Sequence, residues 1–355
     1  MNILNYISIL KKSINLIFPT VFNSPLVLHI SITNKCNSNC LHCDIWKNKD
    51  KTDLTFSSFR QLVDQASTLG LKFVTLTGGE PFMHKDFFRM LKYLKKKKLY
   101  VNISSNGSMI NETNAEKLKE IEVDSVIISL DGTTNSHNKQ RGQNNSFYSA
   151  INSIQLLNKY KVRTDIGFCM TKNNYNDIPA FLKLIDKYSI HNLYLYPFYL
   201  NPTNLSNKTI NEWKNKDQKF FTNEQLNELK HIFNSSNFKS RFDKIDSLFF
   251  KKLIKFNSGE DIPLEEFPCH APLISSIINC NGDILPCWTS SVKIGNIYTD
   301  RFDKIWHSKK YKEIRNKIRK NKCDVKNVNC FCSTHRLTSA RINLLFRLKV
   351  MLGFV

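Results

Sequence analysis

Six short apolar runs alternate with helix-like segments between Leu26 and Leu200, and this alternation constrains the fold more than any other feature of the chain. Strands that alternate with helical patterns are typical of repeated βα units, which build a parallel sheet. Six such units are too few for a closed eight-stranded barrel. We therefore expect an α/β fold, a partial (β/α)6 TIM-like barrel, with an active site on the loops that follow the strands.

The elements of this barrel are assigned from residue type and periodicity. Continuous runs of Val, Ile, Leu, Phe and Tyr are typical of buried parallel strands, and they cover Leu26–Thr33, Lys72–Thr77, Tyr100–Ser104, Ser125–Leu130, Arg163–Met170 and Asn192–Tyr199. Apolar positions three and four apart predict helices, and they cover Phe56–Leu69, Lys85–Lys96, Glu112–Ile121, Ser146–Lys159 and Asp177–Tyr188.

The ten cysteines fall into an early group and a late group, with only Cys169 between them. This distribution indicates metal binding, because a disulfide-stapled fold is small and dense in cysteine. Cys169 lies in an apolar strand, where a cysteine usually acts as a small hydrophobe, and we assign it no role. Metal-binding thiolates need a reducing compartment, and Lys11 and Lys12 interrupt the apolar N-terminal stretch, so we expect no secretory signal and a cytoplasmic protein.

Cys36, Cys40 and Cys43 form a CxxxCxxC loop directly after the first expected strand. Three thiolates on a four-iron cluster leave one iron open for a substrate, whereas structural zinc usually has four ligands. A zinc site would have to recruit His42, which adjoins Cys43 too closely for both side chains to reach one metal easily. The loop therefore predicts an open [4Fe–4S] cluster.

The chain carries 52 Lys and Arg residues against 30 Asp and Glu residues, a formal net charge of +22. A strong basic excess attracts nucleic acids and anionic membranes. Here the lysines are scattered along the chain instead of being gathered in one motif. We therefore favour a solvated basic surface and expect no nucleic-acid partner.

These motifs make the chain resemble the radical S-adenosylmethionine (SAM) superfamily, whose CxxxCxΦC signature fits the three cysteines with His42 at Φ. The resemblance extends from about Leu26 to Cys332. Gly78-Gly79-Glu80-Pro81, after the second strand, resembles the family's GGEP motif, which engages the amino group of SAM. The ends of the third and fourth strands are similar to segments that contact the ribose and carboxylate. The resemblance implies cofactor-binding roles for His42, Gly78, Gly79, Glu80, Pro81, Asn106, Ser129 and Asp131.

Arg141-Gly142 resembles an Arg-Gly pair of the same family. A salt-bridged surface arginine fits the sequence equally well, so both interpretations stay open here.

The late cysteines surround a predicted hairpin, because Asn281-Gly282 between the apolar runs Leu273–Cys280 and Ile284–Trp288 is a strong turn signal. This region resembles the auxiliary iron–sulfur domain called SPASM, or its shorter twitch form. The resemblance implies a second [4Fe–4S] cluster, with Cys280 left unassigned and a four-thiolate zinc site as the alternative. The implied ligands are Cys269, Cys287, Cys323 and one of Cys330 or Cys332.

The expected organisation has five regions. They are an amphipathic N-terminal extension (1–24), the barrel (25–200), a connector with at least one helix around Asn223–Asn234 (201–267), the SPASM/twitch-like domain (268–335) and an amphipathic tail (336–355). Basic amphipathic helices bind anionic membrane surfaces. Peripheral membrane contact is thus an alternative to packing of the two termini on the protein itself.

The resemblance implies an enzyme that reductively cleaves SAM at the [4Fe–4S] cluster. The resulting 5′-deoxyadenosyl radical would abstract hydrogen from an unknown substrate, which is a peptide, a small molecule or a lipid, and flavodoxin or ferredoxin would supply the electron. The competing interpretation is a non-catalytic zinc-thiolate protein with a basic nucleic-acid-binding surface. That interpretation gives no reason for Gly-Gly-Glu-Pro or for six βα units.

Overall fold

The computed structural model describes residues 24–197, 221–260, 262–320 and 322–323. Cys330, Cys332, the C-terminal tail and all but the last residue of the N-terminal extension lie outside these ranges. The roles that the sequence assigns to them stay predictions. No helix in the described ranges is both long and apolar enough to cross a membrane.

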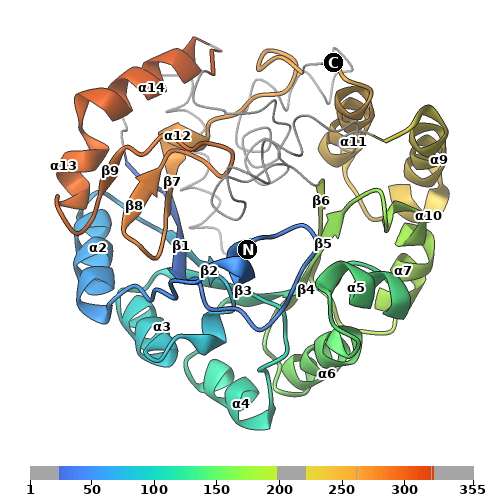
Figure 1. Ribbon diagram of the computed structural model, residues 1–355, viewed down its shortest axis with the longest axis horizontal. Coiled ribbons are helices and arrows are strands. Elements are labelled where there is room, and N and C mark those ends of the chain that lie inside the picture. The colour runs from blue at the N-terminus through green and yellow to red at the C-terminus, as the bar shows by residue number, and fades with distance from the viewer. Residues whose placement is uncertain (1–23, 198–220, 261, 321, 324–355) are drawn as a thin grey trace.

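Six parallel strands form the centre of the fold, with helices on their outer side (Figure 1). Each strand lies within two residues of its predicted position, and the predicted partial barrel is confirmed. The strands are β1 (Val27–Thr33), β2 (Phe73–Gly78), β3 (Tyr100–Ser105), β4 (Ser125–Ser129), β5 (Thr164–Met170) and β6 (Asn192–Pro197). On β1, alternate side chains such as Leu28 and Ile30 are fully buried in the apolar core that the helices cover.

Six α-helices connect these strands or flank them. They are α2 (Phe56–Thr68), α3 (Phe87–Lys96), α4 (Glu112–Glu120), α5 (Thr134–Arg141), α6 (Ser146–Lys159) and α7 (Ile178–Ile185). The sequence predicts all of them except α5, whose residues are polar throughout and give no apolar stripe. A buried contact holds α5 instead, because the backbone N–H of Asp131 donates to Nδ1 of His137 at 3.0 Å.

The C-terminal strands extend the same sheet. β7 (Ser275–Ile278) pairs with β1 in parallel, and β8 (Asp283–Leu285) and β9 (Gly295–Asn296) follow in antiparallel pairing. The described strands form one nine-stranded sheet in the order β6-β5-β4-β3-β2-β1-β7-β8-β9. The predicted Asn-Gly hairpin between β7 and β8 is confirmed. Gly282 has φ +84°, and the ring of Tyr298 fills the space that a Cβ would need.

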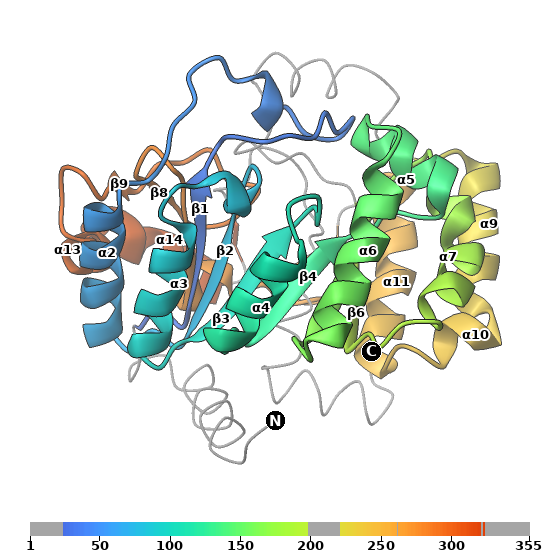
Figure 2. The ribbon, with the colours of Figure 1, turned by 90° about the horizontal axis from the view of Figure 1, so that it is seen from below.

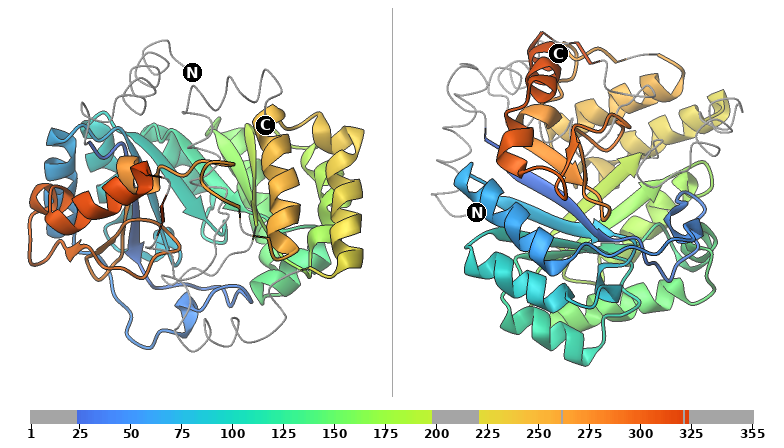
Figure 3. Two further views of the ribbon diagram at one scale, coloured as in Figure 1. Left: turned by 90° about the horizontal axis from the view of Figure 1, so that it is seen from above. Right: turned by 60° about the vertical axis from the view of Figure 1, so that its left-hand side comes forward.

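Further helices complete the described structure. The connector contains the predicted α9 (Asn223–Asn234), and in addition α10 (Ser236–Lys239) and α11 (Lys244–Asn257). The C-terminal region contains α12 (Ala271–Ile274), α13 (Phe302–Trp306) and α14 (Lys309–Arg319). Figure 3 shows α13 beside α2, where the backbone N–H of Phe302 donates to Oε1 of Gln65 at 2.6 Å. The C-terminal region is therefore attached to the barrel by side-chain contacts as well as by the sheet.

Candidate active site

The three early cysteines lie on a long loop that follows β1 and crosses the ends of the strands to reach α5 (Figure 2). The base of this loop is closed by hydrogen bonds between its two ends. Nδ2 of Asn34 donates to the Asp50 carbonyl at 2.8 Å, and the Thr52 N–H donates to Oδ1 of Asn34 at 2.7 Å. The Thr33 hydroxyl donates to Asp53 at 2.7 Å. The loop is thus a closed unit at the carboxyl end of the sheet, where the sequence places the site.

The end of α5 holds the middle of this cysteine loop. The Asn39 N–H donates to the Arg141 carbonyl at 3.2 Å, and the Leu41 N–H donates to the Gln140 carbonyl at 3.0 Å. Gly142 follows in the left-handed region, with φ +66°. These bonds position the backbone on both sides of Cys40.

Burial disfavours the thiolate form of all three cysteines. It raises the pKa of Cys36 to about 11 and that of Cys43 to about 12, and it raises the pKa of the buried Cys40 as well. A thiolate in such surroundings needs nearby positive charge. Iron supplies that charge to its sulfur ligands, so three thiols on one loop, one buried and two half-buried, are a donor set that fits a [4Fe–4S] cluster. The fourth iron of such a cluster, which no cysteine of the loop would bind, would be open for SAM.

The GGEP segment packs directly against the start of the cysteine loop. The Gly79 N–H donates to the Thr33 carbonyl at 2.8 Å, and the Glu80 N–H donates to the Lys35 carbonyl at 2.8 Å. A Cβ at Gly78 would overlap the Thr33 carbonyl oxygen, and one at Gly79 would overlap that of Lys35. Both glycines are therefore required by close backbone contact. Pro81 begins the short helix η2 (Pro81–Met83) beside them.

The carboxylate of Glu80 joins the ends of β2 and β3. Oε1 accepts hydrogen bonds from Ser105 Oγ at 2.9 Å and from the Phe82 N–H at 3.3 Å, and Oε2 accepts one from the Asn106 N–H at 2.8 Å. The side chain is fully buried, and burial raises its pKa to about 7 despite these bonds. In the structure, Glu80 thus links the ends of β2 and β3 by hydrogen bonds. Its contact with the amino group of SAM stays a prediction.

Asn106 connects the end of β3 to the cysteine loop. Its Nδ2 donates to Oδ1 of Asn37 at 2.8 Å and to Oγ of Ser38 at 3.0 Å, both between Cys36 and Cys40. Ser129, the other predicted contact of this kind, is the last residue of β4 and is partly exposed. No sequence pattern predicts the hydrogen bonds of Asn106 to the loop, because its partners lie about 70 residues away along the chain.

Arg141 is a buried member of the site, so the interpretation as a surface arginine is wrong. Its Nε lies 2.7 Å from Oδ2 of Asp131, which is fully buried, and its NH1 donates to the sulfur of Cys40 at 3.7 Å. Burial would raise the pKa of Asp131, but Arg141 and nearby histidines hold it below the usual value. Asp131 therefore faces Arg141, and its predicted contact with SAM stays a prediction.

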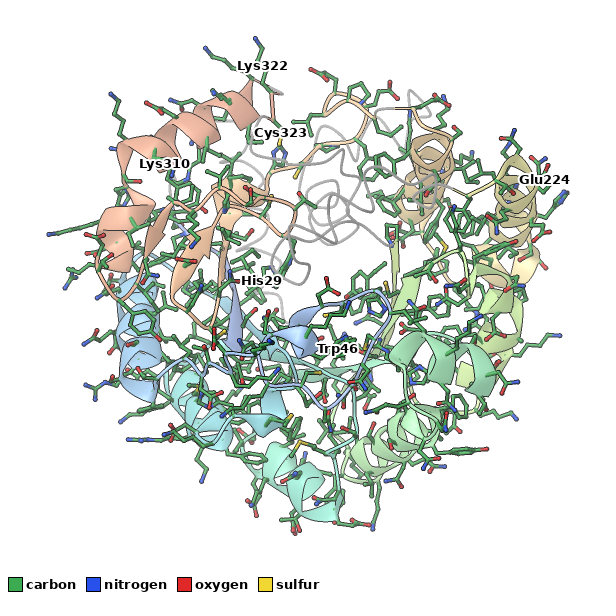
Figure 4. The ribbon with its side chains drawn as sticks, viewed as in Figure 1. His29, Trp46, Glu224, Lys310, Lys322 and Cys323 are labelled. Atoms are coloured by element: carbon green, nitrogen blue, oxygen red, sulfur yellow. The ribbon has the colours of Figure 1, made fainter. Side chains whose placement is uncertain are left out.

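His42 and Trp46 make two further contacts of the cysteine loop. Nδ1 of His42 lies 2.9 Å from Nε2 of Gln140, and burial lowers the pKa of His42 to about 4, so its imidazole is neutral. Trp46 donates from Nε1 to the Cys40 carbonyl at 3.3 Å. Figure 4 shows Trp46 on the inner side of the ring of helices, together with His29 of β1. His29 contacts Trp288, with ring centroids 5.5 Å apart, so this side of β1 meets the residue that follows Cys287.

The late cysteines occupy four positions in the described C-terminal region. Cys269 precedes α12, Cys280 lies in the turn between β7 and β8, Cys287 follows β8, and Cys323 follows α14. None of the described cysteines forms a disulfide bond. Within the described ranges, no three His, Cys, Asp or Glu side chains are grouped so that they could hold a single metal ion. The ligand set of the auxiliary cluster stays a prediction, because both candidates for its fourth ligand, Cys330 and Cys332, lie outside the described residues.

Two family models match the chain, one over the early cysteine group and one over the late group. The Radical SAM superfamily model matches residues 30–185, and the model of the SPASM iron-sulfur cluster-binding domain matches residues 269–331. The chain carries a radical SAM domain followed by a SPASM domain. The prediction of this family is confirmed, and with it the family's cofactors, iron–sulfur clusters and SAM.

Two relatives illustrate how this radical SAM protein aligns with proteins of known activity. It is 30% identical over 185 residues to Fe-coproporphyrin III synthase of Methanosarcina barkeri, which covers 51% of this chain and 46% of the relative. It is 22% identical over 309 residues to the sporulation killing factor maturation protein SkfB of Bacillus subtilis, which covers 86% of this chain and 69% of the relative. The chain thus spans about half the length of the first curated relatives that it matches.

The fold is also found in solved radical SAM structures. The Streptococcus suis protein SuiB bound to its precursor peptide SuiA matches with a TM-score of 0.64 and 18% identity, over 86% of this chain and 70% of SuiB. At this identity the likeness supports the fold alone. It confirms the α/β barrel with a C-terminal sheet region.

Proposed function

We propose that this protein is a radical SAM enzyme with two iron–sulfur sites. Cys36, Cys40 and Cys43 would hold the [4Fe–4S] cluster that binds SAM, and Cys269, Cys287, Cys323 and one of Cys330 or Cys332 would hold an auxiliary [4Fe–4S] cluster. The first cluster would supply the electron that splits the sulfur–C5′ bond of SAM, and the resulting 5′-deoxyadenosyl radical would abstract a substrate hydrogen. One observation carries the proposal: the three-thiol loop, the GGEP segment and the end of α5 are hydrogen-bonded into one unit.

The residues of this unit have separate tasks. The glycines of GGEP bring the backbone close to the cysteine loop, and Glu80 and Asn106 hold the end of β3 against it. We place the methionine part of SAM beside GGEP, and its ribose and carboxylate near Asn106 and Ser129. The barrel walls would keep water away from the radical, because a dry and rigid site limits side reactions.

We propose a peptide as the substrate. The support is the alignment with the maturation protein SkfB over 86% of this chain, which exceeds the 79% aligned with the AdoMet-dependent heme synthase of Oleidesulfovibrio alaskensis. A maturation protein is similar to this chain along the barrel and beyond it. Small molecules and lipids are the competing outcomes of a substrate screen.

The remaining partners follow from this chemistry. A flavodoxin or ferredoxin in the cytoplasm would donate the electron, since the clusters need a reducing compartment. Contact of the amphipathic termini with anionic membranes would be tested by sedimentation with anionic liposomes, with and without residues after Arg341. Equal sedimentation of both proteins would exclude a role for the tail.

The enzyme proposal is tested on anaerobically reconstituted full-length protein. We expect a brown protein with about eight iron atoms per chain if both sites hold four-iron clusters, which forms 5′-deoxyadenosine from SAM after addition of dithionite. The variant Cys40→Ala should lose this activity and about half of the iron. The matched control Cys169→Ala removes a thiol outside the loop and should keep its iron. A colourless, zinc-loaded protein would refute the proposal and support the zinc-thiolate alternative.

A further inference from the structure

The guanidinium group of Arg141 is the one described side chain that donates a hydrogen bond to a cysteine sulfur of the early group. NH1 lies 3.7 Å from Sγ of Cys40, and the arginine side chain is only 11% exposed. A buried charge is poorly screened by water and salt. The field of this cation at the Cys40 sulfur is therefore strong.

Asp131 fixes the guanidinium in this place. Its Oδ2 lies 2.7 Å from Nε of Arg141, and its Oδ1 accepts a hydrogen bond from the Cys169 N–H at 2.8 Å. The Asp131 carbonyl accepts another from Nδ2 of Asn174 at 2.9 Å. The carboxylate of Asp131 is thus held by β5, and its backbone by the segment after β5.

The side chain and the backbone of Arg141 act separately. The backbone carbonyl accepts the hydrogen bond from Asn39 that positions the cysteine loop, whereas the guanidinium contacts only Asp131 and Cys40 among the described partners. A substitution at 141 changes the charge near Cys40 and leaves the backbone bond available. An electrostatic role can therefore be separated from a role in holding the loop.

We propose that Arg141, positioned by Asp131, raises the reduction potential of the [4Fe–4S] cluster that Cys36, Cys40 and Cys43 would hold. This inference rests on the proposed function. Charge and hydrogen bonds at the sulfur ligands are among the factors that set cluster potentials. Reduction by one electron makes the cluster more negative, so a cation at the Cys40 sulfur stabilises the reduced form. The Asp131 carboxylate has the opposite sign and limits this effect.

The test is a potentiometric titration, followed by electron paramagnetic resonance, of the anaerobically reconstituted full chain with dithionite as reductant. The signal of this cluster is the one that Cys36→Ala removes. We expect Arg141→Gln to make reduction about tenfold less favourable, which for one electron is about 59 mV. Arg141→Lys keeps the positive charge, so its reduction potential should lie closer to that of the parent protein. Asp131→Asn removes the opposing charge and should shift the potential upwards.

Arg163→Gln is the matched control, because Arg163 also pairs with a buried aspartate, Asp165, but at the start of β5. It should leave the potential unchanged. Shifts in the same direction for Arg141→Gln and Asp131→Asn would overturn the inference, as would equal potentials in all variants. If Arg141→Gln cannot hold iron, an unshifted or lowered potential in Asp131→Asn overturns it. A parent protein without this cluster would instead refute the proposed function.

Discussion

The carbonyl oxygen of Asn39 occupies the space that a Cβ at Gly142 would need. Asn39 lies between Cys36 and Cys40, and Gly142 follows the end of α5 with φ +66°. Any side chain at 142 must therefore either push the cysteine loop away or move α5. The geometry of the cysteine loop therefore requires a glycine at position 142, although Gly142 lies outside that loop.

We predict that Gly142→Ala loses iron from the first site, because its Cβ displaces Asn39 and with it the thiol of Cys40. The measurement is iron content and 5′-deoxyadenosine formation after anaerobic reconstitution. Gly259→Ala is the control, since Gly259 has φ +97° but no atom within 4 Å of the added Cβ. This control also places an alanine at positive φ, but without the clash, and should keep its iron. Similar iron losses in both variants would contradict this explanation.

We predict that Asn106→Ala loosens the cysteine loop without unfolding the barrel. The variant loses the hydrogen bonds to Asn37 and Ser38, each worth about 1 kcal/mol. Iron should pass to a chelator several times faster than from the parent. Asn114→Ala is the control, as its amide bonds only the nearby Met109 carbonyl. A release rate equal to that of the control would rule out the bridge.

We predict a pH-dependent effect of Glu80→Gln on stability. Burial raises the pKa of Glu80 to about 7 from an ordinary value of 4.5, so the folded protein binds this proton more tightly than the unfolded chain. The stability contributed by this proton is fully present below pH 4.5 and is lost as the pH rises through 7. The shift corresponds to roughly 3 kcal/mol.

Urea unfolding of parent and variant at pH 5 and pH 8 measures this effect. Glutamine does not titrate, so the free energy of unfolding of the parent should fall relative to that of Glu80→Gln between these two pH values. Glu116→Gln, on the exposed side of α4, is the control, and its free energy of unfolding should equal that of the parent at both pH values. A parent-to-variant difference that does not change with pH would show that Glu80 is charged in the folded protein throughout this range.

We predict that Arg315→Ala destabilises the C-terminal region and lowers the auxiliary iron content. The arginine is buried, donates to the carbonyls of Pro272 at 3.0 Å and Trp306 at 2.8 Å, and stacks on the rings of Trp306 and Tyr311. Its loss should cost about 2–4 kcal/mol and release α14, which leads to Cys323. Iron content should fall towards half, while the signal of the first cluster stays. Arg319→Ala, on the same helix, is the control, and an equal loss in both would contradict the prediction.

The sequence predicted the parts of this protein that depend on local pattern. The strands are continuous apolar runs, and the three-cysteine loop and GGEP are short motifs at the ends of strands, so each could be found without the structure. The ion pair of Asp131 and Arg141 could not be found, because it depends on α5, which has no apolar stripe. The helix α11 was missed although Asp243 and Asp246 form a capping box at its start, a signal that the sequence does contain.

The pairing of β7 with β1 limits how such proteins can diversify. The register, which pairs Val27 with Ser275 and Ile30 with Ile278, joins the strand that leads into the three-cysteine loop to the hairpin that carries late cysteines. A slip by one residue would turn every side chain of β7 to the opposite face. An auxiliary domain transplanted from a relative would therefore have to match this sheet edge as well as supply cysteines, and an unmatched graft would leave the edge of β1 open to aggregation. The hydrogen bonds between β1 and β7 would then set the distance between the two proposed iron sites. New substrates would have to be accommodated by changes in the loops.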